Sequence, residues 1–174
     1  MPTPRALLAF VVVVPALLVQ VTVLNRLPLP GAPPDLVLVV VVALALVTDR
    51  SFALLTAFWA GLAADLVPPA THTVGRLALV LALVGWLAAH WGEQVAEDSD
   101  RSAVGPVLVV ALVAVVAGLL DAAVGALLGD PRITWSALAS SVPTAVLYDV
   151  VLAPFVLPGV CALARRVDRE GVFR

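Results

Sequence analysis

The sequence contains few charged residues and no lysine. Charged side chains make up 13% of the 174 residues, and all ten basic residues are arginine. A soluble domain carries about twice that share of charged residues. The chain therefore lacks the polar surface that a soluble fold needs.

Cysteine and histidine are also scarce. Cys161 is the single cysteine, which excludes an internal disulfide, and with only two histidines the sequence gives no metal site. The HExxH zinc motif, the GxSxG nucleophile elbow and the phosphate-binding loop are all missing. These absences predict a protein that is not an enzyme and needs no cofactor or metal. The net charge of −2 and the isoelectric point near 5.5 argue against a nucleic-acid partner.

Apolar residues dominate the composition. Hydrophobic side chains make up 62% of the chain, and its mean hydropathy is +1.10. A helix needs about 20 residues to cross the hydrocarbon core of a bilayer. Apolar segments separated by polar or proline-containing turns cover approximately residues 6–24, 35–48, 51–67, 74–91, 103–128 and 136–164. The pattern predicts an all-α fold, a polytopic membrane helix bundle of about six transmembrane helices in one domain, residues 1–174.

Two of these segments permit more than one interpretation. Residues 35–48 and 51–67 are short for independent spans, because 14 residues of helix cover only about 21 Å. Either a thin-spanning pair or a re-entrant hairpin fits them. Arg5 followed by the apolar run of residues 6–24 also fits the pattern with which a signal peptide begins. That run is longer than a usual signal core and no small-residue cleavage site follows, so we interpret it as a retained helix.

The distribution of arginine predicts the orientation in the membrane. Cytoplasmic loops carry an excess of basic residues. With the N-terminus inside, the inner side holds Arg5, Arg50, Arg101, Arg165, Arg166, Arg169 and Arg174, and the outer side holds Arg26, Arg76 and Arg132. We therefore expect a multi-pass protein of the cell inner membrane with both termini in the cytoplasm.

Three aspartates lie within or at the edge of the apolar segments: Asp65, Asp121 and Asp149. An aspartate at the centre of a membrane helix costs about 2.5–3.5 kcal/mol, so such residues usually face the protein interior and have a function. Each lies on a row of small residues at four-residue spacing. The rows are Ala53-Ala57-Gly61-Asp65, Ala117-Asp121-Gly125-Gly129 and Ser141-Ala145-Asp149-Ala153. Small residues let helices approach closely, so we expect the aspartates to be buried between helices.

Other polar residues are candidates for partner binding or for structural roles. Arg76 has two interpretations: an ion pair with Asp65 across the short intervening loop, or extension of the side chain to the membrane interface. Tyr148 beside Asp149 offers a hydroxyl group for a buried hydrogen bond, although plain packing explains it equally well. Gly61 and Gly75 belong to short motifs described next. For each aspartate the alternative to a specific role is a packing or interfacial position.

Several short motifs follow one another in a characteristic order. They are Pro34-Asp35-Leu36 before a valine-rich segment, Gly61-Leu62-Ala63-Ala64-Asp65-Leu66, Gly75-Arg76-Leu77-Ala78-Leu79, Gly85-Trp86-Leu87-Ala88, and the stretch from Leu147 to Pro158. In this order they resemble the family of the rod shape-determining protein MreD, whose length and hydropathy match nearly the whole chain. The family commonly has asparagine where Asp149 stands here, which is a departure.

The resemblance implies a membrane component of the bacterial elongation machinery. Members of this family act with MreC and, through it, with the cytoskeletal protein MreB, the glycosyltransferase RodA and a class B penicillin-binding protein. The family fold is similar to that of the substrate-binding subunits of energy-coupling factor transporters. No catalysis of its own is implied.

Two hypotheses follow from these observations. The first is a non-enzymatic scaffold that binds an MreC-like protein and directs lateral peptidoglycan synthesis, with helix grooves of small residues receiving the partner's transmembrane helix. The second is a vitamin-type binding subunit of a membrane transporter, which rests on the family architecture and on the three membrane aspartates. A ligand pocket needs several converging polar groups, and this chain has few.

Overall fold

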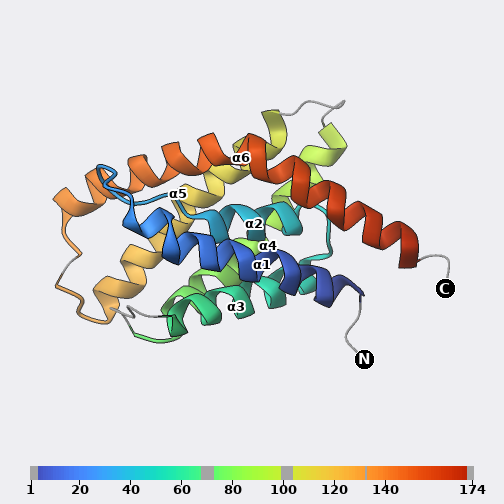
Figure 1. Cartoon of the computed structure of the whole chain (residues 1–174). Coiled ribbons are helices and arrows are strands. Elements are labelled where there is room, and N and C mark those ends of the chain that lie inside the picture. Colours follow the sequence, from blue (N-terminus) through green and yellow to red (C-terminus); the bar gives the residue numbers. More distant parts are fainter. Residues whose placement is uncertain (1–3, 68–72, 99–103, 132, 172–174) are drawn as a thin grey trace.

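A computed structural model describes residues 4–67, 73–98, 104–131 and 133–171 of the chain. Within these ranges the chain forms helices and no strand. The helices are α1 (Pro4–Thr22), the 3-10 helix η1 (Leu24–Arg26), α2 (Leu36–Ala45), α3 (Arg50–Leu66), α4 (Arg76–Asp98), α5 (Val104–Leu127) and α6 (Trp135–Gly171). The all-α prediction is confirmed (Figure 1).

The helices alternate in direction, so the molecule has two distinct ends. α1, α3 and α5 end, and α2, α4 and α6 begin, at one end of the bundle, here called the loop end (Figure 1). The beginning of α1 and the end of α6 lie at the opposite end, which we call the terminal end. Both described ends of the chain are therefore on the same side of the bundle, as an even number of crossings requires.

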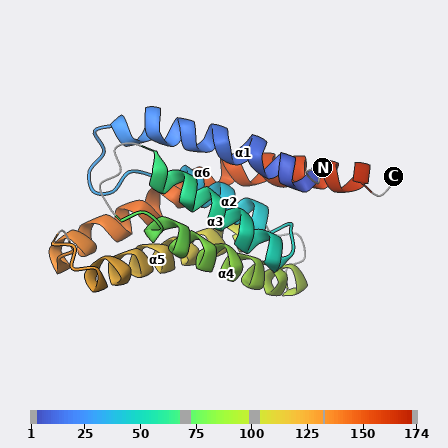
Figure 2. The same cartoon turned by 90° about the horizontal axis from the view of Figure 1, so that it is seen from below.

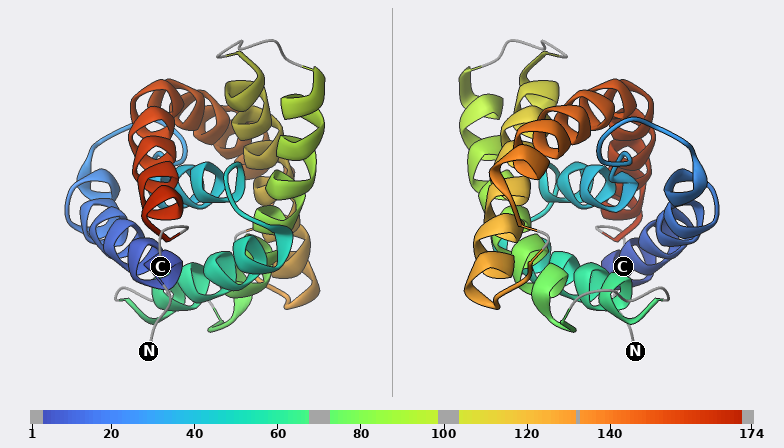
Figure 3. Two further views of the ribbon diagram at one scale, coloured as in Figure 1. Left: turned by 90° about the vertical axis from the view of Figure 1, so that its right-hand side faces the viewer. Right: turned by 90° about the vertical axis from the view of Figure 1, so that its left-hand side faces the viewer.

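The shortest α-helix, α2, occupies the centre of the bundle. The side chains from Val37 to Ala45 are all buried. The other five α-helices surround α2 (Figure 3), and α1 lies on the side opposite to α4 and α5 (Figure 2). An unbroken run of apolar residues suits this place, since a helix that is apolar all round is a buried helix. The hydrophobic core of the described residues thus forms around α2.

The two short segments, α2 and α3, both pack against other helices of the bundle. The ten residues of α2 cover about 15 Å, and neighbouring helices shield it from lipid. α3 packs along α4 more extensively than along α2. Both segments therefore belong to the helix bundle, with α2 at its centre.

Four helices are long and apolar enough to cross a membrane by length and composition. They are α1 together with η1, α4 up to Gln94, α5, and α6 up to Val167. α2 is shorter, and α3 has 17 residues. The protein is therefore an integral membrane protein in which a central short helix is enclosed by longer ones.

Two predicted boundaries are wrong. The fourth segment was expected to end at residue 91 before a charged loop, but α4 continues to Asp98. Glu93 in the added turn forms an ion pair with Arg50 at the start of α3, so α3 supports the extension. The sixth segment was expected over residues 136–164, but α6 continues to Gly171. Its added residues include arginine and glutamate, good helix formers that need no apolar surroundings.

Candidate functional site

The polar side chains predicted from the sequence gather at the loop end, where they form three separate clusters. Each cluster joins two or three elements: consecutive helices in the first cluster, and segments that are at least 45 residues apart in the other two. The clusters are centred on Asp65, Arg76 and Asp149. Each is described below from its residues upward.

In the first cluster, Asp65 at the end of α3 caps the beginning of α4. Its side chain is fully buried. One carboxylate oxygen accepts hydrogen bonds from the backbone N–H groups of Gly75 and Ala78, at 2.8 and 3.2 Å, and the other accepts from Leu77 at 3.3 Å. The first N–H groups of a helix have no partner within the helix. Asp65 thus acts as an N-terminal cap supplied by a neighbouring helix.

Two glycines make this arrangement possible. Gly61 lies one turn before Asp65 on α3, and a Cβ atom there would lie 2.5 Å from the carbonyl oxygen of Leu77 and 2.7 Å from the Cα of Ala78. Backbone therefore packs directly against backbone at this point. Gly75 has a φ of +97°, a conformation that glycine adopts without strain. Gly61 therefore permits the close packing of α3 on the start of α4, and Gly75 permits the backbone turn that leads into α4.

In the second cluster, Arg76 joins the beginning of α4 to the end of α5. Its guanidinium group is 7% exposed and binds both carboxylate oxygens of Asp121, from Nε and Nη2, at 2.7 Å each. Nη2 also donates to the carbonyl oxygen of Asp121, and Nη1 donates to Asp130 at 3.0 Å. A two-point pair of this kind fixes geometry as well as charge.

The row of small residues on α5 provides the space for this guanidinium. A Cβ atom on Gly125 would lie 2.6 to 2.9 Å from three atoms of the Arg76 guanidinium group. Asp121 and Gly125 are one turn apart, so one face of α5 supplies both the acceptor and the space. The sequence suggested a pair between Arg76 and Asp65. Instead, the guanidinium contacts Asp121 and Asp130, while Asp65 binds backbone N–H groups.

In the third cluster, Asp149 of α6 holds the beginning of the central helix. Asp149 is 2% exposed, and its Oδ1 accepts a hydrogen bond of 2.7 Å from the backbone N–H of Asp35. Asp35 in turn caps α2 through its own side chain, which accepts from the N–H of Leu38. The two carboxyl groups are close enough to repel each other electrostatically. Asp149 therefore fixes the position of the residue that starts α2.

Further side chains from α1 and α6 hold the same α1–α2 connection. Gln20 of α1 accepts from the N–H of Leu36 and donates to the carbonyl of Pro34. On α6, the Thr144 hydroxyl oxygen accepts from the N–H of Ala32, and the Tyr148 hydroxyl donates to the carbonyl of Pro30 at 3.3 Å. For Tyr148 the sequence left a buried hydrogen bond and plain packing open, and the hydrogen bond that the structure has lies at the surface.

We predict that Asp149→Asn leaves stability near that of the wild type. The asparagine carbonyl oxygen accepts the Asp35 N–H equally well, and the substitution removes one of two carboxyl groups that repel each other. Asp149→Leu leaves that N–H without a partner, and we expect it to lower the free energy of unfolding by about 1–3 kcal/mol. Unfolding in detergent, followed by tryptophan fluorescence, measures both variants. Equal losses for Asn and Leu would contradict the assigned hydrogen bond.

The rows of small residues are largely occupied by the protein's own helices. Ala53 and Ala57 on α3 are buried, and a Cβ atom on Gly85 of α4 would lie 2.6 Å from the Cβ of Ala57. In the row on α5, Asp121 and Gly125 contact Arg76, whereas Gly129 is exposed. On α6, Ala153 is buried but Ser141 and Ala145 border a cavity. Among the described residues no group of three His, Cys, Asp or Glu side chains could hold a metal ion.

Comparison with known proteins identifies one family. The family model described as rod shape-determining protein MreD matches residues 4–167, nearly the whole chain. No curated protein and no solved structure matches the chain. The matched range includes every residue of the three clusters.

Proposed function

This chain belongs to the MreD family of rod shape-determining proteins, and on that premise we propose that it is a non-enzymatic scaffold that binds an MreC-like protein. It is an integral membrane protein with a role in rod shape determination. The finer proposal is that it works as a single membrane domain and regulates lateral peptidoglycan synthesis through this partner. MreB, RodA and a class B penicillin-binding protein are then contacted indirectly.

The observation that carries the proposal, beside the family, is how the buried polar groups are used. Asp65, Arg76 and Asp149 each bind a backbone group or an opposite charge on another element. Such contacts hold helices in fixed relative positions. They also occupy the carboxylate and guanidinium groups that a catalytic reaction would have to use. A rigid frame of this kind suits a protein that positions others.

The orientation predicted from arginine is part of the proposal. The terminal end, with Arg5, Arg50 and the exposed Arg165 and Arg166, faces the cytoplasm of a cell whose inner membrane holds the protein. The loop end, with the three polar clusters, then faces outward.

A vitamin-type binding role is less well supported. Pockets for small ligands usually measure about 300–1,000 Å³ and contain several converging polar groups. The cavity between α5 and α6 measures about 280 Å³, and its polar side chains are Asp121 and Ser141. Asp121 is already bound by Arg76.

Co-purification in a mild detergent tests the scaffold proposal. We expect tagged protein to retain the MreC-like protein of the same genome in a fixed ratio. Folding of both proteins is checked first by size-exclusion chromatography, and an unrelated membrane protein of similar size is the control bait. If two folded proteins do not associate, the scaffold proposal is wrong, and binding of vitamins to the purified protein becomes the next experiment.

A further inference from the structure

Ion pairs mark where the bundle leaves the bilayer at the terminal end. Arg50 at the start of α3 binds Glu93 of α4. Arg5 at the start of α1 lies 3.9 Å from Asp49, directly before α3. These four side chains are 41–61% exposed. Charged groups are costly in the hydrocarbon core, so exposed ones lie at its boundary. The beginnings of α1 and α3 and this part of α4 are therefore at one level.

A second set of polar contacts brings three helices to one level at the loop end. Asp65 near the end of α3 binds the N–H of Gly75, directly before α4. Arg76 at the start of α4 binds Asp121 of α5. Between this level and the ion pairs at the terminal end, the 17 residues of α3 cover about 26 Å. The hydrocarbon core of a bilayer is about 30 Å thick. The α3 side of the bundle is therefore short for an undisturbed bilayer.

At the loop end, α5 and α6 continue beyond this level. From Asp121 to its last residue, Leu127, α5 covers about 9 Å more. After the turn, α6 begins at Trp135. We call residues 122–131 and 133–138 the α5–α6 tip. Figures 1 and 2 show that the end of α5 and the beginning of α6 extend farther at this end than α3 and α4 do. The bundle is therefore longer on its α5–α6 side.

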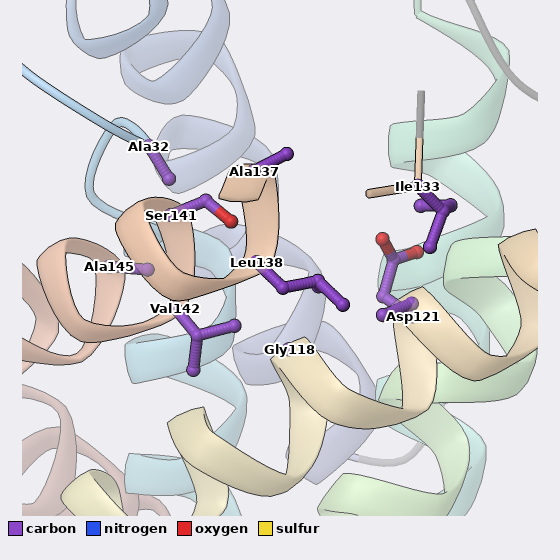
Figure 4. Close-up of a pocket in the computed structure, with 10 residues that line it drawn as sticks. Ala32, Gly118, Asp121, Ile133, Ala137, Leu138, Ser141, Val142 and Ala145 are labelled. Atoms are coloured by element: carbon purple, nitrogen blue, oxygen red, sulfur yellow. The ribbon is translucent and has the colours of Figure 1, made fainter. Parts of the chain in front are cut away.

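The α5–α6 tip is apolar on its inner and on its outer side. Ile133 and Leu138 line the cavity of about 280 Å³ together with Asp121 (Figure 4). Leu127 and Trp135 are not part of this lining, and they are 87% and 88% exposed. Contact of such side chains with water is unfavourable. Tryptophan is enriched in the layer between headgroups and acyl chains, so the outer side of the tip suits lipid.

The exposed apolar surface of α5 continues into the tip. Side chains at intervals of four, seven or eight residues share one side of a helix. The large exposed apolar side chains of α5 include such a row, formed by Val104, Leu108, Leu112, Leu119 and Leu127. The row runs along the 24 residues of α5, about 36 Å. Its beginning is level with Glu93, because the distance to it from Asp121 along α5 equals that from Arg76 to Glu93 along α4. The extra length of α5 therefore lies at the loop end.

We propose that lipid covers the outer side of the α5–α6 tip, and that the bilayer around the protein is thinner beside α3 than beside α5 and α6. A bilayer adapts its local thickness to the apolar segments that it surrounds, at a modest cost per ångström. At the loop end, the headgroup layer then lies near Leu66 beside α3, and near Leu127 and Trp135 beside the tip. The inference goes beyond the proposed function and does not depend on the MreC-like partner.

Spin labels at exposed positions test the proposal. In a Cys161→Ala background, one cysteine is introduced at a time: Leu66→Cys or Leu127→Cys at the loop end, and Ser51→Cys or Val104→Cys as matched controls at the terminal end. Labelled proteins that elute as monodisperse species are reconstituted into vesicles of dioleoyl phosphatidylcholine and dioleoyl phosphatidylglycerol. The accessibility of each label to oxygen and to a water-soluble nickel complex gives its depth. We expect the Leu66 and Leu127 labels to lie at equal depth, although about 9 Å separate them along the bundle. The two controls should also lie at equal depth.

Three outcomes overturn the proposal. If the nickel complex reaches the Leu127 label freely, water rather than lipid covers the tip. If the Leu66 label lies about 9 Å deeper than the Leu127 label, the bilayer has one thickness on both sides of the protein. If the loop-end labels lie at equal depth but the controls do not, the protein tilts in a bilayer of uniform thickness. None of these measurements includes the partner, so the scaffold function is tested separately by co-purification.

Discussion

Arg76→Ala is expected to destabilise the protein by about 3 kcal/mol. Removing one partner of a buried ion pair leaves an uncompensated charge and typically costs 3–5 kcal/mol. Arg76 itself is 7% exposed, but Asp121 is 38% exposed, so water partly hydrates the carboxylate that remains. The expected loss therefore lies at the lower end of the range. Unfolding by a denaturing detergent, followed by tryptophan fluorescence, gives the free energy directly.

Arg50 provides a matched control for Arg76. Arg50 also starts a helix and binds a carboxylate, but its side chain is 41% exposed and that of Glu93 is 51% exposed. An exposed ion pair contributes little to the free energy of unfolding, because water hydrates the remaining charge when one partner is removed. Arg50→Ala should therefore unfold close to the wild type. If the two alanine variants unfold alike, the second cluster does not hold α4 to α5.

The geometry of the guanidinium gives a finer test. Arg76→Lys keeps the charge but loses the planar group that reaches Asp121 with two nitrogens and Asp130 with a third. We expect lysine to recover only part of the stability that alanine loses. Full recovery would show that charge alone matters at this position.

The sequence predicted the helices well because a bilayer limits the choice of structure. Backbone groups in lipid must be satisfied within the chain, so long apolar runs become helices. The ends of α4 and α6 were not predictable in the same way. The residues beyond 91 and beyond 164 are polar, and polar residues outside the membrane form a helix or a loop according to neighbours such as Arg50.

Burial of two of the aspartates was also predictable, but their partners were not. The cost of a charge in lipid is enough to place Asp65 and Asp149 inside the bundle. Their acceptor oxygens bind the backbone N–H groups of Gly75 and Asp35. Since nearly every residue has such a group, the sequence does not show which of them a carboxylate binds. The position of Asp35 directly before an apolar run was a usable signal for a helix cap. Gln20, a single amide in an apolar helix, was another signal.

The small residues have a common explanation in the structure. Gly61 permits backbone contact with α4, and Gly125 makes space for Arg76. Both therefore support contacts within the chain: backbone packing at Gly61 and the Arg76 ion pair at Gly125. Ser141 and Ala145 of the α6 row, together with Asp121 of the α5 row, border the cavity between α5 and α6. The four-residue spacing in the sequence identified all three rows. It did not show which small residues pack against other helices of the chain and which border the cavity.

Asp65→Ala is the second substitution with a large expected effect. It leaves the N–H groups of Gly75, Leu77 and Ala78 without their acceptor at the buried start of α4. Each buried donor left without a partner costs about 1–3 kcal/mol. We expect the total to exceed 3 kcal/mol, which is a large part of the roughly 5–15 kcal/mol by which an ordinary protein is stable, and therefore to lower the yield of folded protein. The measurements are the yield of monodisperse protein and the unfolding midpoint of any that is recovered.

Asp49 shows why burial, rather than capping alone, sets the size of this effect. Asp49 caps α3 by accepting from the N–H of Phe52, yet its side chain is 61% exposed. When the Asp49 carboxylate is removed, water can bind the N–H of Phe52 in its place. Asp49→Ala should therefore lower the free energy of unfolding by about 1 kcal/mol, as at ordinary helix caps. Asp65→Asn should fall between the two, because its amide keeps one acceptor oxygen where the carboxylate had two. If Asp65→Ala costs no more than Asp49→Ala, the start of α4 is held by packing against Gly61 and not by the carboxylate.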